Sequence, residues 1–179
     1  MSVSKTEGVT LHRFESCTHR NRLGRKNNMN KMLNNALLVS GAVVVKRAKS
    51  GRHYWFLVKQ SDEEGWEIPK TVVRKGESSV RASIRMTGEQ GGMNAKVLEE
   101  VGRSGGSTTL KGKVVPRRLI YYLLQFEASG EVLGFVEHGW LEYKNARKKV
   151  TSKSEKEMLK QAKTIYEKWK KEQEKEKII

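Results

Sequence analysis

Cysteine is almost absent from this chain of 179 residues, with Cys17 as its single representative. One thiol excludes an intrachain disulfide and a zinc site built from thiolates, so we expect a reducing, cytosol-like compartment. The four histidines, His12, His19, His53 and His138, share no metal-ligand spacing. The sequence therefore carries no signature of a metal site made from cysteine or histidine.

Long apolar runs are also missing. The stretch from Ala36 to Val45 is interrupted by Ser40 and Gly41 and falls short of the ~20 residues that a membrane-spanning helix needs. We therefore expect no membrane partner and a cytoplasmic protein. The alternative location is an organellar matrix such as that of the mitochondrion, because residues 1–35 hold seven Lys or Arg together with Ser and Thr, a weak match to a transit peptide.

Acidic residues are scarce relative to basic ones. The 36 Lys and Arg outnumber the 20 Asp and Glu, which gives a formal net charge of +16. Such a charge attracts polyanions, so RNA, a ribonucleoprotein assembly and a nucleotide polyphosphate are the expected partners. The alternative is that a Lys-rich surface only keeps the protein in solution.

The pattern of apolar residues predicts one α/β domain between two charged ends. Residues 1–35 lack apolar periodicity and are expected to form a basic, unstructured arm that can bind protein partners. Residues 36–169 form the domain with its C-terminal helix, whose start is assigned to a capping box of Ser154 and Glu157, and residues 170–179 form a charged tail. The remaining elements are a helix over 79–90 and strands over 37–46, 54–59, 93–101, 108–115, 119–127 and 132–140, with a flexible glycine-rich segment at 102–106.

One motif carries chemical information. Trp66-Glu67-Ile68-Pro69-Lys70 is followed by Gly76-Glu77, by Arg85 with seven residues between it and Glu77, and by Gly92. This register resembles the box of the Nudix hydrolase superfamily, and the residues around it, from about 37 to 163, are similar to its diadenosine tetraphosphate hydrolase-like branch. The resemblance implies an α/β/α sandwich with a mixed β-sheet, and hydrolysis of nucleoside diphosphate derivatives with Mg²⁺ or Mn²⁺.

The departures from the box concern its metal ligands. Thr71 stands at the position of the opening glycine, Met86 and Gln90 stand at two of the three helix carboxylates, and Glu89 alone is kept. Helical spacing places 86, 89 and 90 on one face, where three carboxylates would hold the metal ions. Glu89 is therefore the candidate catalytic residue and metal ligand, and any Mg²⁺ or Mn²⁺ is expected to bind weakly. The family draws an extra carboxylate from a later strand or loop, for which Glu127, Glu137 and Glu142 remain open.

The basic residues near the motif are candidates for binding phosphate without cutting it. Lys70, Arg74, Lys75 and Arg81 lie on or after the loop, and Lys111, Lys113, Arg117 and Arg118 form a second group suited to an RNA backbone or to a solvated strand edge. Glu77 and Arg85 are assigned to a structural pair that orients the loop against the helix.

Three functions remain open on these grounds. The first is a Nudix-fold protein that binds nucleotide polyphosphate or RNA in a ribonucleoprotein assembly, with hydrolysis lost or weak. The second is an active metal-dependent pyrophosphohydrolase acting on dinucleoside polyphosphates or RNA 5′ ends. The third is a structural subunit that binds partner proteins through its arm and tail.

Overall fold

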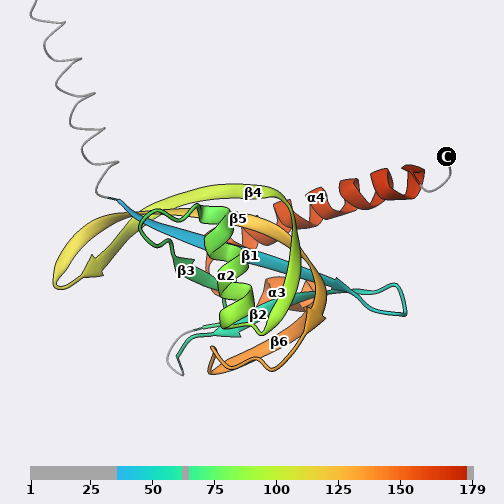
Figure 1. Cartoon of the computed structure of the whole chain (residues 1–179), viewed down its shortest axis with the longest axis horizontal. Helices are drawn as coiled ribbons and strands as arrows, with labels where there is room; N and C mark the ends of the chain where they lie inside the picture. The colour runs from blue at the N-terminus through green and yellow to red at the C-terminus, as the bar shows by residue number, and fades with distance from the viewer. Residues whose placement is uncertain (1–35, 62–64, 177–179) are drawn as a thin grey trace, which may run out of the picture. The chain divides into compact units, whose positions relative to one another are not determined.

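The Val- and Leu-rich run after residue 36 forms the central strand of a mixed sheet, in a computed structural model that describes residues 36–61 and 65–176 (Figure 1). The elements are β1 (Leu37–Arg47), β2 (His53–Lys59), β3 (Lys70–Val72), α2 (Ser79–Glu89), β4 (Met93–Leu110), β5 (Lys113–Ser129), β6 (Glu137–Glu142), α3 (Tyr143–Lys149) and α4 (Lys153–Glu176). The expected basic arm, residues 1–35, lies outside the described residues. None of the described helices is long and apolar enough to cross a membrane.

Strand β1 joins the two parts of the sheet, whose order is β4-β5-β1-β2-β6 with β3 also paired to β1. One edge of β1 pairs in parallel with β5, from Leu37 opposite Arg117 to Val45 opposite Gln125. Its other edge pairs antiparallel with β3 at its start and with β2 at its end. All other strand pairs are antiparallel, so the sheet is mixed.

Alternation along β1 divides the core between the two faces of the sheet. Val39, Val43 and Val45 lie in an apolar cluster with residues of α3 and α4. Ala42 and Val44 lie in a second cluster with Met86 of α2. Helix α2 thus covers one face and α3 with α4 the other, as Figure 1 shows, and this confirms the expected α/β/α sandwich.

The hairpin of β4 and β5 corrects the prediction for the glycine-rich segment. Gly102 to Gly106 lie inside β4 and pair with Tyr121 to Arg117 of β5, so the strand predicted over 93–101 continues to Leu110. The strand predicted over 108–115 is wrong, because the turn at 111–112 divides it between β4 and β5. A Cβ atom at Gly102 would lie 2.9 Å from the side chain of Gln161 and 3.2 Å from the sulfur of Met158, both in α4. Glycine at 102 therefore serves close packing rather than flexibility.

The start of α4 differs from the predicted capping box. Ser152, not Ser154, caps the helix, because its Oγ accepts a hydrogen bond from the backbone N–H of Glu155. The Glu155 side chain is buried and turns to the sheet, where it accepts a hydrogen bond from the Ile68 N–H at 2.9 Å and pairs with Lys70. The helix also continues to Glu176, seven residues beyond Trp169, with exposed Lys–Glu pairs at i,i+4 along this part.

We predict that Glu155→Ala lowers the free energy of unfolding by about 3–5 kcal/mol, because it leaves the half-buried Lys70 ammonium and the Ile68 N–H with one partner fewer each. Urea unfolding followed by circular dichroism measures the change. Glu157→Ala removes an exposed carboxylate from the same helix and is expected to change stability by less than about 1 kcal/mol. Equal effects of the two variants would contradict this account of α4 docking.

Candidate functional site

The loop before α2 is shaped by its own backbone and by two serines. Gly76 adopts a positive φ of 79°, and Ser78 caps the helix by accepting a hydrogen bond from the Arg81 N–H. Ser40 interrupts the apolar run of β1 because its hydroxyl donates to the carbonyl of Ser79 at 2.6 Å. This anchor was not predicted, although a serine inside the apolar run from Leu37 to Val45 was its signal.

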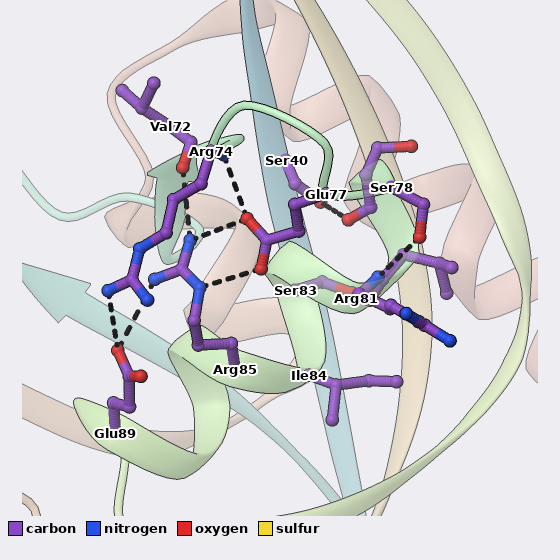
Figure 2. Close-up of polar contacts among 12 residues, drawn as sticks. Ser40, Val72, Arg74, Glu77, Ser78, Arg81, Ser83, Ile84, Arg85 and Glu89 are labelled. Atoms are coloured by element: carbon purple, nitrogen blue, oxygen red, sulfur yellow. Dashed lines mark hydrogen bonds and ion pairs between the residues drawn. The ribbon is translucent and has the colours of Figure 1, made fainter.

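Glu77 and Arg85 form a two-bond ion pair that ties the loop to the helix (Figure 2). The Nε of Arg85 donates to Glu77 Oε1 at 2.8 Å and its Nη2 to Oε2 at 3.1 Å. The same Oε2 accepts the Arg74 N–H at 2.9 Å, and Nη2 also donates to the Val72 carbonyl at 3.2 Å. The hydrogen bonds from Arg85 and from the Arg74 backbone lower the pKa of Glu77 to about 2, so its charge is kept throughout the neutral range.

Glu89 lies at the end of α2, where two arginines converge on it. Its Oε2 lies 3.4 Å from Arg74 Nη2 and 3.4 Å from Arg85 Nη1, as Figure 2 shows. The Arg85 guanidinium thus bridges Glu77 and Glu89, while Arg74 reaches Glu89 from the loop. A cation binding at Glu89 would therefore lie close to two guanidinium groups of like charge.

Several solved structures with a similar arrangement of elements are Nudix proteins. The Ap4A hydrolase of C. elegans matches with a TM-score of 0.59 and 20% identity over 73% of this chain and 98% of that chain. The dihydroneopterin triphosphate pyrophosphohydrolase of E. coli matches with a TM-score of 0.58 and 13% identity, over 69% of this chain and 92% of that chain. The chain has the Nudix fold.

A binding domain of the same fold is also similar. The Nudix domain of NrtR from Shewanella oneidensis, solved with ADP ribose, matches with a TM-score of 0.54 and 14% identity over 72% of this chain and 87% of that chain. No protein-family model matches the sequence, and the search of curated proteins finds no match. At these identities the comparisons establish the Nudix fold alone, so the activity has to be inferred from the residues of the site.

Met86 and Gln90, which replace two carboxylates of the box, are both withdrawn from solvent to some degree. Met86 is fully buried in the cluster that contains Phe56, Val58 and Leu124. Gln90 is half-buried, and its backbone carbonyl accepts a hydrogen bond from the Gly134 N–H at 3.0 Å. Helical spacing still places 86, 89 and 90 on one side of α2, but Met86 lies at the core edge of that side while Glu89 is exposed.

The residues present do not fit the metal ions that the fold implies. Mg²⁺ takes oxygen ligands in octahedral geometry and binds through one or two carboxylates plus substrate phosphate. Within residues 36–61 and 65–176, no group of three or more His, Cys, Asp or Glu could hold a metal. Of the three carboxylates left open, Glu137 pairs with Lys59 and Glu142 with Arg52, while Glu127 is exposed.

Lys70 lies on the other face of the sheet from the box helix, which corrects its assignment as a phosphate ligand of the loop. Its ammonium contacts Glu67 at 2.6 Å and Glu155 at 2.5 Å. Burial alone would lower the pKa of Lys70, but the two carboxylates outweigh it and raise the pKa. Sequence spacing placed Lys70 beside the loop, whereas its pairing opposite Gly41 turns the side chain toward α4.

The other basic candidates lie in two places. Arg74, Lys75 and Arg81 are exposed around the start of α2, and Figure 2 shows Arg81 pointing away from the Glu77–Arg85 pair. Lys111 and Lys113 lie at the tip of the β4–β5 hairpin. Arg117 and Arg118, the other two members of the second predicted group, lie on opposite faces of the sheet. Side chains alternate along β5, so Arg117 lies on the same face as Leu119 and Tyr121, which is the α4 side. Arg118 lies on the same face as Tyr122, which contacts Ser79 of α2.

We predict that Met86→Glu lowers the free energy of unfolding by about 3–5 kcal/mol, because it places an ionisable carboxyl in an apolar cluster with no exposed surface. Urea unfolding measures the loss. Ile84→Glu, on an exposed part of the same helix, is the matched control and is expected to change stability by about 0.5 kcal/mol or less. A stable Met86→Glu variant that gains Mn²⁺ binding would show that this position does face a metal site.

Proposed function

We propose that this chain is a Nudix-fold binding protein for nucleotide polyphosphate or RNA, in which hydrolysis is lost or weak, and that it works within a ribonucleoprotein assembly. The observation that carries the proposal is the contact of both Arg74 and Arg85 with Glu89. The one helix carboxylate kept from the box has two guanidinium neighbours, and Met86 fills the core where a second carboxylate would be needed. A site of this composition favours an anion over a divalent cation.

The loop residues support phosphate binding without cleavage. Arg74 is exposed, its contact with Glu89 is long at 3.4 Å, and an exposed ion pair of this kind contributes at most about 1 kcal/mol. A phosphate group, which accepts two parallel hydrogen bonds from a guanidinium, can therefore replace Glu89 as the partner of Arg74. Lys75 and Arg81, both exposed beside the loop, add positive charge to the same region.

The β4–β5 hairpin supports RNA as the larger partner. It extends beyond the body of the domain in Figure 1, with Lys111 and Lys113 near its tip and Arg118 further along β5. A net charge of +16 supplies the long-range attraction, and an RNA backbone supplies phosphates at regular spacing. We also propose a cytoplasmic or organellar-matrix location and protein contacts through residues 1–35.

The second candidate is an active Mg²⁺- or Mn²⁺-dependent Nudix hydrolase. The fold supports it, because the similar structures include hydrolases, and so does the exposed Glu89 at the end of the box helix. This candidate requires a metal to displace Arg74 and Arg85 from Glu89, with substrate phosphate as a further ligand. The composition of the site makes it the weaker of the two.

The binding proposal is tested by the salt dependence of RNA affinity. We expect Lys111→Ala/Lys113→Ala/Arg118→Ala to weaken binding of a single-stranded oligoribonucleotide and to reduce the slope of log K against log salt by about 2, since each lost phosphate contact removes about 0.7. Fluorescence anisotropy of a labelled oligonucleotide from 50 to about 300 mM salt measures both quantities.

The matched control removes three positive charges elsewhere on the surface. Lys153→Ala/Lys171→Ala/Lys175→Ala changes three exposed residues of α4 and is expected to leave most of the slope intact. Equal losses in the two triple variants would mean that RNA responds only to net charge. Undetectable RNA binding by the unaltered chain at low salt would contradict the RNA part of the proposal.

A further inference from the structure

A concave site lies on the face of the sheet opposite the box helix α2. It is a cleft of about 1000 Å³ between the start of β2, helix α3 and the second half of α4. Trp55 of β2 and Tyr166 of α4, which line it, belong to the apolar cluster on the α4 side. The lining of the cleft therefore includes neither Glu77 of the loop nor Glu89 of α2.

Positive charge converges on this cleft from three parts of the chain. Its lining contains five cationic residues against two carboxylates, Glu142 and Glu167; the cations are Arg52, Lys144, Arg147, Lys163 and Lys170. Arg52, Lys163 and Lys170 each have an acidic neighbour, at 3.4, 3.4 and 3.6 Å. Lys144 and Arg147 have no ion pair among the described residues and are exposed, so these two are available to a ligand.

The wall between these cations is aromatic and already ordered by packing. Trp55 meets Tyr143 and Tyr166 edge to face, with ring centroids 6.1 and 6.4 Å apart. Tyr143 is half-buried, with Lys163 Nζ 4.7 Å from its ring centroid. A half-exposed aromatic ring beside unpaired cations suits a ligand that has both a flat ring and a negative charge.

His53 also lines the cleft. Its ring meets that of Tyr166 with centroids 5.1 Å apart, so the imidazole is part of the aromatic wall. Its Nε2 is buried with no hydrogen-bond partner in the described part of the chain. Burial, then the positive charges of Lys170 and Arg47, lower the pKa of His53, which favours the neutral imidazole.

We propose that this cleft binds a nucleotide, with the base against Tyr143 and the phosphates on Lys144 and Arg147. The ligand is a free nucleotide or one nucleotide unit of a single-stranded RNA, which share this chemistry. An acidic peptide would use the cations and leave the aromatic wall unused, so the wall favours the nucleotide. The inference shares a ligand class with the proposed function but uses different residues, so the two can fail separately.

The test measures binding of ATP to the full chain by calorimetry in metal-free buffer. Lys144→Ala/Arg147→Ala is expected to weaken ATP binding about tenfold or more, because it removes both unpaired cations. Lys148→Ala/Lys153→Ala removes the same charge from exposed residues outside the cleft and is expected to change affinity by about twofold or less. Equal losses in the two pairs would overturn the proposal. So would a loss confined to Arg74→Ala/Lys75→Ala, which would leave the proposed function of the loop intact.

The base contact has its own test. Tyr143→Leu keeps an apolar side chain and is expected to weaken binding of ATP while leaving tripolyphosphate unchanged, since tripolyphosphate has no ring. Equal effects on both ligands, or hexaglutamate binding as tightly as ATP, would overturn the assignment to a nucleotide. Competition between ATP and octauridylate then distinguishes a free nucleotide from a single-stranded RNA as the ligand. Tighter binding of ATP assigns the cleft to a free nucleotide, and tighter binding of octauridylate assigns it to RNA. Urea unfolding of each variant shows that it is folded.

Discussion

The arrangement of the box loop depends on one guanidinium, that of Arg85. Its two hydrogen bonds to Glu77 and a third to the Val72 carbonyl hold the loop between β3 and α2 against the helix. Held there, the same group lies 3.4 Å from Glu89, and the loop it fixes brings Arg74 to an equal distance. The guanidinium that orders the loop thus also contacts Glu89. The Nudix scaffold is kept, and Glu89 has two arginine neighbours.

The two faces of the sheet differ in how the helices pack on them. On the α2 side, Met86 completes an apolar cluster and closes the helix against the sheet. On the α4 side, Glu155 and Lys70 dock the start of α4, and the second half of that helix forms one wall of the cationic cleft. Because α4 is one continuous helix from Lys153 to Glu176, docking at its start positions Lys163 and Tyr166 at the cleft. The buried ion pair and the cleft are linked through a rigid element.

Much of the fold followed from the sequence, because periodicity and box spacing are local signals. The helix after Ser78 and the strands at 37–46 and 54–59 were predicted within one residue or so of their bounds. The face of the sheet on which the Lys70 side chain lies was not predictable, since it depends on the register of β3 against β1. Nor was the pairing of Glu89, which needs the fold of the loop. The cleft depends on the packing of α3 against α4, and its signal in the sequence is the pair of cations, Lys144 and Arg147, next to Tyr143.

The central claim, that the site is built for anions rather than for metal-dependent cleavage, is tested most directly by turnover. The full chain is incubated with diadenosine tetraphosphate, a nucleoside diphosphate sugar or 5′-triphosphate RNA, in Mg²⁺ and in Mn²⁺, beside Glu89→Gln. With Glu89 neutralised by two arginines and Met86 buried, we expect product formation by both proteins to be weak or absent, and equal. Robust turnover by the unaltered chain that Glu89→Gln abolishes would contradict the account and establish an active hydrolase.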